Sequence, residues 1–290
     1  MNSLFIEAPA KINWRLKILG RKKDGYHLLC SLMQNICLTD TIFLSISRQD
    51  SCLISKGPAI FQEDNLAYAA WLLLKRELGL TYGLKIRIEK RIPIGAGLGG
   101  GSADAAAVLK GANELFDLGL SREELSGFGL KLGADIPFCL LGGLAKAEGV
   151  GEKLTPLPLP PPLSLLLANP GYSVSTREVF ADFSLSNQAF ALEKKENAAC
   201  FELSQALLAG DIYAIIALME NDLTASAYRL CPPIYKLAQS LRALGLNPLL
   251  CGSGGTLITL AENSDALAKA KVALAFVPWL VQVKTIGGTA

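Results

Sequence analysis

The sequence predicts an α+β fold in two domains, and three observations lead to this expectation. Apolar and polar residues alternate at strand spacing in the first third of the chain, most clearly over 84–88. Segments with apolar residues at helical spacing lie among these strands, in an order too irregular for repeated strand–helix–strand units. A proline-rich run at 156–162 cannot continue a helix or a central strand, so we expect domains at 1–155 and 156–290.

The predicted elements of the first domain rest on local patterns. A helix begins after Asn65, which can cap it, and ends before Gly79. A second helix is predicted to begin at Ser102 as its N-cap, with Asp104 in its first turn, and a capping box at Ser121 opens a third helix. Strand-like segments in this domain span residues 12–19, 41–47 and 84–90.

The second domain is predicted to mix short strands with helices. Apolar runs bounded by turn residues indicate strands at 163–168, 249–251, 256–260 and 281–285. Longer segments with helical periodicity indicate helices at 198–208, 211–225, 233–244 and 265–275.

Charge and hydropathy patterning exclude several classes of protein. The chain of 290 residues carries 28 basic and 26 acidic side chains without a long basic run, so we expect no nucleic-acid partner. The first residues lack the basic start and apolar stretch of a signal peptide, and prolines interrupt the longest uncharged run. We therefore expect a cytoplasmic protein without membrane contact. The expected oligomeric state is a monomer or a weak homodimer.

Cysteine and histidine usage argues against a metal centre. The seven cysteines form no Cys-x-x-Cys pair, and their odd number is typical of reduced, mostly buried thiols. His27 is the only histidine in the sequence, which disfavours a zinc cluster or a multi-histidine site. We therefore expect no protein metal ligands.

The most informative stretch of the chain is a glycine-rich loop that leads into an alanine-rich segment. Its residues are Pro93, Ile94, Gly95, Ala96, Gly97, Leu98, Gly99, Gly100, Gly101, Ser102 and Ala103. Without a Cβ, glycine lets backbone N–H groups approach a polyanion, and the first amides of the following helix have no intrahelical partner. The loop therefore predicts a phosphate-binding site in preference to a plain turn.

Two common nucleotide-binding patterns do not account for this loop. Gly95 to Gly100 satisfies Gly-x-Gly-x-x-Gly, but a dinucleotide fold also needs an acidic residue about 20 positions on, at the end of the next strand. The nearest acids, Glu114 and Asp117, are predicted to lie in the following helix or at its exit. No Gly-Lys dipeptide occurs in the chain, which excludes a P-loop. An NAD-binding oxidoreductase is therefore the least favoured alternative.

Four further motifs set the loop in a larger pattern. They are Ala8-Pro9-Ala10-Lys11-Ile12-Asn13, Asp24-Gly25-Tyr26-His27, Gly133-Ala134-Asp135-Ile136-Pro137-Phe138 and Cys251-Gly252-Ser253-Gly254-Gly255-Thr256. Together with the glycine-rich loop, this set resembles the GHMP small-molecule kinases over residues 8–259. The last motif departs from that family, which usually has Ser-Gly-Ser-Gly-Pro-Thr where this chain has Cys251 first and Gly255 fifth.

The resemblance implies a fold, a reaction and a catalytic pair. The implied fold has an N-terminal ribosomal-protein-like βαβ domain that binds ATP and a C-terminal ferredoxin-like α+β domain, with the substrate in the cleft between them. The implied reaction transfers the γ-phosphate of ATP to an alcohol and requires Mg²⁺. Lys11 and Asp135 match the family's catalytic positions, although in isolation Lys11 would be a surface charge and Asp135 a cap or turn residue.

The same resemblance implies binding residues. The glycine-rich loop and Asn65 match ATP-binding positions, and Asn65 can cap its helix as well. The matched substrate-binding positions are Asn13, Tyr26, His27, Thr176 and Phe180. Among them, Tyr26 and Phe180 resemble the rings on the two faces of a cytosine, and His27 resembles its hydrogen-bonding partner. The resemblance therefore implies a small-molecule substrate that carries a cytidine diphosphate.

Two alternatives stand beside this interpretation. Another GHMP kinase, acting on homoserine or a mevalonate-type alcohol, has no use for Tyr26, His27 and Phe180, because its substrate carries no cytosine. A non-catalytic nucleotide-binding protein on the same fold has no need of both Lys11 and Asp135.

Overall fold

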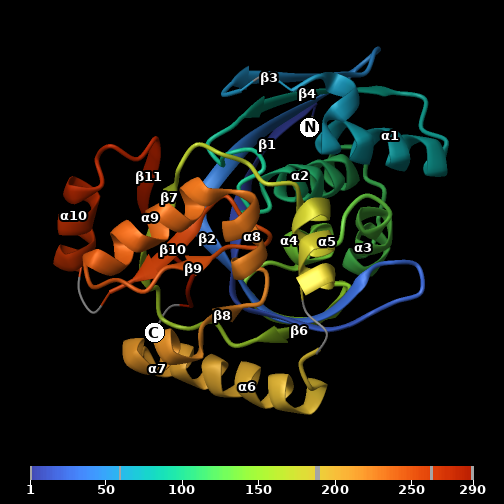
Figure 1. Ribbon diagram of the computed structural model, residues 1–290. Helices are drawn as coiled ribbons and strands as arrows, with labels where there is room; N and C mark the ends of the chain where they lie inside the picture. Colours follow the sequence, from blue (N-terminus) through green and yellow to red (C-terminus); the bar gives the residue numbers. More distant parts are fainter. Residues whose placement is uncertain (1, 59, 187–189, 262–263, 289–290) are drawn as a thin grey trace. The chain divides into compact units, whose positions relative to one another are not determined.

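Two long strands begin the chain in the computed structural model, which describes residues 2–58, 60–186, 190–261 and 264–288 (Figure 1). Strand β1 spans Ser3–Arg21 and β2 spans His27–Ser47. Each contributes residues to both of the units into which the chain divides. Unit 1 consists of Met1–Lys11, Leu38–Ile94 and Gly99–Gly142, and unit 2 of Ile12–Cys37, Gly95–Leu98 and Gly143–Ala290.

These units interleave along the sequence, whereas the predicted domains meet at one point, between residues 155 and 156. The predicted boundary separates two domains of the fold that the resemblance implies, and these contact-based units do not test it, so it stays a prediction. Pro156 itself lies within β6 (Lys153–Leu157), and the other prolines of the run follow that strand without regular structure. Both units combine helices with strands, so the predicted α+β class is confirmed.

Unit 1 packs its helices against a small group of strands (Figure 1). Strand β4 (Gly83–Glu89) pairs antiparallel with residues 41–47 of β2 and parallel with β3 (Ser51–Lys56). The helices are α1 (Leu66–Leu78), α2 (Gly100–Leu115), α3 (Arg122–Leu130) and α4 (Ile136–Leu141), with a 3-10 turn at Gln62–Asp64. Apolar side chains of these helices and of β2 and β4 form one buried core.

The ends of two helices in unit 1, α1 and α3, follow the predicted signals. The Asn65 side chain accepts a hydrogen bond from the N–H of Ala67 at 2.9 Å, and Gly79 ends α1 with a φ of +63°. Ser121 and Glu124 form the predicted capping box at the start of α3. Both predictions are confirmed, because a cap depends only on residues adjacent in sequence.

The start of α2 differs from the prediction. The helix begins at Gly100, and Gly99 with a φ of +70° occupies the N-cap position, so Ser102 lies inside the first turn and is not the cap. Asp104 lies further into the helix than predicted and points into unit 1, where it pairs with Lys90 at 2.6 Å. The helix starts early because a glycine accepts the left-handed conformation that this turn requires.

Unit 2 contains two groups of strands within the described ranges. In the first, β5 (Leu144–Gly149) pairs antiparallel with residues 29–34 of β2 and with β6, and β8 (Glu220–Asn221) pairs parallel with β1. The second is an antiparallel sheet in the order β11–β7–β10–β9, which shares an apolar core with helices from the end of the chain. Its strands are β7 (Ser164–Asn169), β9 (Leu249–Leu250), β10 (Leu257–Leu260) and β11 (Trp279–Lys284).

One predicted helix of unit 2 is wrong. The segment 211–225 contains two helices separated by β8, because Asn221 is buried there and donates to the carbonyls of Leu250 and Gly252, each at 2.8 Å. This contact joins residues far apart in sequence, so helical periodicity cannot reveal it. The helices are α5 (Thr176–Ser186), α6 (Glu193–Ala209), α7 (Ile212–Leu218), α8 (Thr224–Leu230), α9 (Pro232–Ala243) and α10 (Ser264–Ala273).

The cysteines and the helices of the structure can be compared with what the composition predicted. The seven cysteines are free, and five of them are buried. Cys30 and Cys200 bring their sulfur atoms within 3.5 Å of each other in unit 2. Within the described ranges, no helix combines the length and the apolar character needed to cross a membrane.

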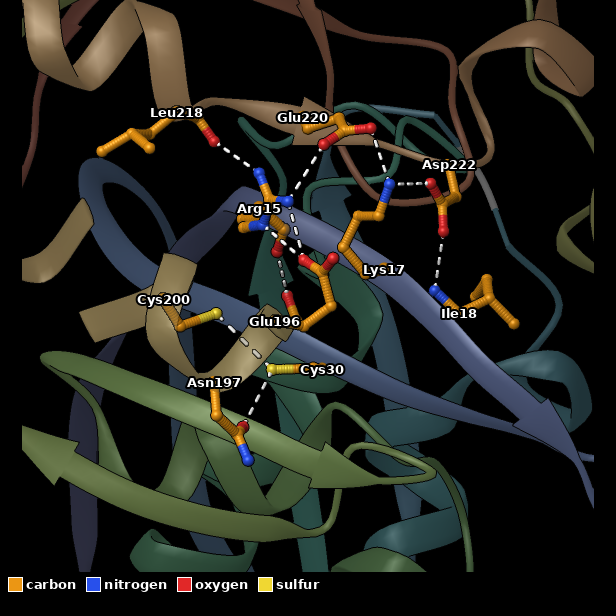
Figure 2. Close-up of polar contacts among 11 residues, drawn as sticks. Arg15, Lys17, Ile18, Cys30, Glu196, Asn197, Cys200, Leu218, Glu220 and Asp222 are labelled. Atoms are coloured by element: carbon orange, nitrogen blue, oxygen red, sulfur yellow. Dashed lines mark hydrogen bonds and ion pairs between the residues drawn. The ribbon is translucent and has the colours of Figure 1, made fainter. Parts of the chain in front are cut away.

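A buried arginine on β1 joins three elements of unit 2 (Figure 2). Arg15 donates two hydrogen bonds to the carboxylate of Glu196 on α6, at 2.9 and 2.7 Å, and one to the carbonyl of Leu218 on α7, at 2.8 Å. Its guanidinium also lies 3.0 Å from the carboxylate of Glu220 in β8. Because Arg15 and Glu196 are both buried, water cannot replace either partner, and the pair links α6 to β1.

Glu196→Ala should lower the free energy of unfolding by about 3 to 5 kcal/mol, because it leaves the buried charge of Arg15 without its main partner. Urea unfolding measures the change. Glu220→Ala is the matched control: its carboxylate also contacts Arg15 but is 50% exposed, so we expect a loss of about 1 kcal/mol or less. Equal losses in the two variants would contradict the assigned role of Glu196.

Candidate active site

Lys11 and Asp135 form an ion pair in unit 1. The Nζ of Lys11, on β1, lies 3.2 Å from Oδ2 of Asp135, at the N-cap position of α4. Lys11 is 4% exposed and Asp135 39% exposed, so the lysine is not the surface charge that it would be in isolation. Asp135 occupies a cap position, but its side chain makes no capping hydrogen bond and faces the lysine. The pair therefore offers a cation and a solvent-accessible carboxylate side by side.

The N-terminus of α2 lies directly against this lysine. A Cβ built on Gly99 would be 2.9 Å from Cγ and 3.1 Å from Cε of Lys11, so only glycine permits the approach. The N–H of Ala103 donates to the carbonyl of Gly99 at 2.8 Å. The backbone N–H groups of the residues just before Ala103 lie in the first turn of α2, where a helix has no preceding carbonyl to accept from them. The positive end of the helix dipole thus lies next to a lysine, an arrangement that favours negative charge.

Residues 95–98 of the glycine-rich loop belong to unit 2 and pack against the motif Cys251–Thr256 of the same unit, called the third motif from here on. The carbonyl of Ala96 accepts from the N–H of Thr256 at 3.1 Å, and the thiol of Cys251 donates to the carbonyl of Gly97 at 3.5 Å. A Cβ on Gly97 would lie 2.0 Å from the carbonyl oxygen of Cys251. Gly97 thus allows two backbone segments to touch, a role that phosphate binding alone does not predict.

The third motif departs from its family pattern in a way that the backbone explains. Gly255 has a φ of +94°, which the ring of a proline cannot adopt. A Cβ on Gly255 would also lie 3.0 Å from Cα of Ala96. Cys251 is fully buried and replaces a serine hydroxyl with a weaker donor. The turn in this chain therefore requires glycine at the fifth position.

His27 and Phe180 come together in unit 2. Their ring centroids are 5.0 Å apart with an angle of 34° between the planes, and Phe183 meets the histidine edge-on at 6.3 Å. The Nε2 of His27 lies 2.7 Å from Oγ of Ser184. Burial, with a smaller effect of the positive charge of Arg21, lowers the pKa of His27.

The other predicted substrate residues are less closely grouped. Tyr26 is 64% exposed, and no ring contact joins it to Phe180 among the described residues. Asn13 is buried, and its amide donates to the hydroxyl of Ser31 at 2.8 Å. Thr176, the first residue of α5, shares a hydrogen bond of 2.7 Å with Ser253 of the third motif. The predicted enclosure of a base between Tyr26 and Phe180 therefore stays a prediction.

A buried cluster under the start of α2 escaped the sequence analysis. The Nζ of Lys90 lies 2.5 Å from Oδ2 of Asp40 and 2.6 Å from Oδ2 of Asp104, and all three side chains are buried. A Cβ on Gly100 would be 3.4 Å from the same Nζ. The cluster anchors the chain on both sides of the glycine-rich loop. The sole signal for this cluster in the sequence was Asp104, a charged residue within an alanine-rich segment.

The carboxylate of Asp104 is buried in a cluster where negative charge is in excess, because Asp40 lies on the same ammonium group of Lys90. Burial raises the pKa of Asp104 to about 7, Lys90 opposes this rise, and the neighbouring Asp40 adds to it. Its Oδ1 has no hydrogen-bond partner among the described residues. Two carboxylates thus share one ammonium group, and a proton on Asp104 relieves the imbalance.

Among the described residues, no three His, Cys, Asp or Glu side chains come close enough together to hold a metal ion. Ser102 lies in the first turn of α2, with its hydroxyl 3.9 Å from where a Cβ on Gly133 would stand, near the turn that bears Asp135. It is the side-chain hydroxyl that the glycine-rich loop itself supplies.

Two family models match separate segments of the chain. The model of the GHMP kinases N terminal domain matches residues 65–143, and the model of the GHMP kinases C terminal matches residues 203–277. A 4-diphosphocytidyl-2-C-methyl-D-erythritol kinase from Shouchella clausii is 40% identical over 264 residues, which cover 90% of this chain and 86% of the relative.

Solved structures give the same picture of similarity. A crystal structure of 4-(cytidine 5'-diphospho)-2C-methyl-D-erythritol kinase matches with a TM-score of 0.79 at 35% identity, covering 98% of this chain and 100% of that chain. Homoserine kinase from Cytophaga hutchinsonii matches with a TM-score of 0.74, covering 99% and 95% of the two chains. At 18% identity, the second match is a likeness of fold alone.

Gly97→Ala should destabilise the protein by about 3 kcal/mol and weaken ATP binding, because a positive φ and a clash with Cys251 add together. Gly245→Ala is the matched control in unit 2, since Gly245 has a φ of +76° against +78° for Gly97, with no atom within 4 Å of the added Cβ. Its expected loss is the strain of the backbone alone, about 1 to 2 kcal/mol. Urea unfolding and ATP titration measure both variants, and equal losses would remove the assigned packing role of Gly97.

Asp104→Asn should change how stability depends on pH. The folded protein holds a proton on Asp104 that the unfolded chain releases near its ordinary pKa, so this group makes folding less favourable as pH rises from about 4 to about 7. The variant lacks this loss, so its free energy of unfolding relative to the native chain should rise between about pH 4 and about pH 7. Glu114→Gln, an exposed change on the same helix, should leave the pH dependence unaltered. A constant difference across this range would argue against a protonated Asp104.

Proposed function

The chain belongs to the GHMP kinases, and we propose that it uses ATP to phosphorylate the 2-hydroxyl of 4-diphosphocytidyl-2-C-methyl-D-erythritol. The observation that carries the proposal is the ion pair of Lys11 and Asp135 beside the N-terminus of α2. A relative at 40% identity and a solved structure at 35%, both named for this substrate, support the choice of acceptor.

In this proposal, the glycine-rich loop binds the phosphates of ATP. Its glycines leave backbone N–H groups accessible, and the helix dipole of α2 favours negative charge at the same end. Asn65 caps α1 and offers a polar side chain near the adenine. Mg²⁺ bound with the nucleotide would offset negative charge on the phosphates. Ser102, in the first turn of α2, would supply a hydroxyl oxygen to this ion.

Lys11 and Asp135 then act at the transferring group. The oxygen of the acceptor hydroxyl attacks the γ-phosphorus, the bond to the bridging oxygen breaks, and ADP leaves with that electron pair. Asp135 orients the hydroxyl or takes up its proton, which its 39% exposure permits. Lys11 offsets negative charge on the phosphoryl oxygens. The chemistry needs no covalent phospho-enzyme.

Cytosine binding rests on His27 and Phe180, which unit 2 holds together. Phe180 provides one aromatic face, and the exposed Tyr26 is free to cover the other when the base binds. Asn13 and Thr176 supply further polar contacts. Homoserine and mevalonate carry no base that would use these rings.

An assay of the purified protein with ATP and Mg²⁺ tests the proposal. The cytidine diphosphate substrate should release ADP, whereas homoserine and mevalonate should not. Asp135→Asn should lower kcat/KM by about 10² to 10⁴-fold and leave the Kd for ATP nearly unchanged, because the carboxylate acts on the acceptor. Glu123→Gln, on the exposed side of α3, should behave as the native chain.

Three results would each contradict part of the proposal. Turnover of homoserine or mevalonate alone would assign the chain to a different acceptor. ATP binding without turnover of any acceptor would indicate a non-catalytic protein. Loss of ATP binding in Asp135→Asn would move that residue to the nucleotide site.

A further inference from the structure

A chain of two hydrogen bonds determines which nitrogen of His27 carries its proton. The hydroxyl of Ser184 donates to the carbonyl of Phe180, four residues earlier on α5, at 3.0 Å. With its one proton directed to that carbonyl, the serine oxygen accepts from Nε2 of His27, which lies 2.7 Å away. This arrangement assigns the hydrogen to Nε2, and in the neutral ring Nδ1 is then a bare acceptor.

Nδ1 of His27 is an acceptor in the neutral form of the imidazole ring, and the surroundings of the ring favour that form. Burial lowers the pKa of His27, and the positive charge of Arg21 acts in the same direction. A doubly protonated ring would turn Nδ1 into a donor, so this environment preserves its acceptor character.

The acceptor nitrogen of His27 remains accessible. Among the described residues, the buried side-chain nitrogen and oxygen atoms without a hydrogen-bond partner are Oδ1 of Asp104 and the hydroxyl of Tyr228. The hydrogen bond of the His27 side chain within the described ranges is made through Nε2. Because Nδ1 has no protein partner there and is not among those buried atoms, it retains contact with solvent.

Packing holds the ring in this orientation. Phe180 lies over the imidazole at 5.0 Å, and Phe183 meets it at an angle of 81°. Both belong to α5, the helix that carries Ser184. A single helix therefore sets the position, the tilt and the tautomer of His27.

We propose that Ser184 is a positioning residue that holds His27 in the Nε2–H tautomer, so that Nδ1 selects a base with an exocyclic amino group. The inference rests on the proposed function, because it requires His27 to face the base of the substrate. Cytosine offers an amino group as donor, whereas uracil has a carbonyl oxygen at that position, which would meet Nδ1 lone pair to lone pair. Ser184 thus sets the preference for a cytidine over a uridine diphosphate, without touching the substrate.

Nitrogen-15 NMR of histidine-labelled protein tests the tautomer directly, since the chain contains one histidine. The native protein should show a protonated Nε2 and an unprotonated Nδ1. Adding CMP should shift the Nδ1 resonance, and UMP should not. Ser184→Ala should move both resonances toward the average of two tautomers, whereas Ser184→Thr, which keeps the hydroxyl, should restore the native spectrum.

Kinetics with the cytidine substrate and its uridine counterpart provide the second readout. Ser184→Ala should lower the ratio of kcat/KM for cytidine over uridine by about tenfold, the effect of one hydrogen bond, mainly through the KM for cytidine. Ser186→Ala is the matched control on α5: its hydroxyl makes the same bond to a carbonyl four residues earlier, at 2.7 Å, without a histidine beyond it. That variant should keep the native ratio.

The outcomes separate this inference from the proposed function. A native Nδ1–H tautomer, or an unchanged base preference in Ser184→Ala, overturns the role of Ser184 even if the kinase reaction proceeds. A chain that fails to phosphorylate the cytidine substrate overturns the proposed function, while the NMR titration with CMP and UMP still decides the tautomer and the base preference.

Discussion

A Cβ at Gly97 or Gly99 would force neighbouring atoms to move, and the structure around the glycine-rich loop depends on this constraint. At Gly97 an added Cβ would meet the backbone of Cys251, and at Gly99 it would meet the side chain of Lys11. Both glycines also adopt positive φ angles that other residues reach only with strain. Apart from the proposed role in phosphate binding, the glycines bring the loop against the third motif in unit 2 and the start of α2 against a lysine in unit 1.

Buried cations are the second organising feature, and each has a carboxylate partner. Lys90 holds two aspartates beneath α2, Arg15 holds Glu196 across unit 2, and Lys11 holds the accessible Asp135. The first two pairs are closed to water and serve the fold, because removing a partner would leave an uncompensated charge. The pair that includes Asp135 is open to solvent on the carboxylate side. Accessibility, rather than charge, distinguishes the proposed catalytic pair from the structural ones.

Local chemistry explains what could be predicted. The cap at Asn65, the capping box at Ser121 and the stop at Gly79 each depend on residues within one turn, so they were correct. The predicted start of α2 was wrong. Serine is a residue type that often caps helices, which favoured Ser102, but Gly99 with its positive φ occupies the N-cap position. The helix predicted at 211–225 failed for a different reason, since its break depends on a contact with a distant strand.

By itself, the sequence determined the α+β class, the glycine-rich loop and the motifs that mark a GHMP kinase, because these are properties of neighbouring residues and of residue type. Only the tertiary structure decided which distant side chains meet. It paired Lys11 with Asp135, assembled the charges around Lys90 and brought Ser184 to His27. Such pairings depend on the course of the whole backbone, and no local pattern records which proton donor faces which acceptor once the chain has folded.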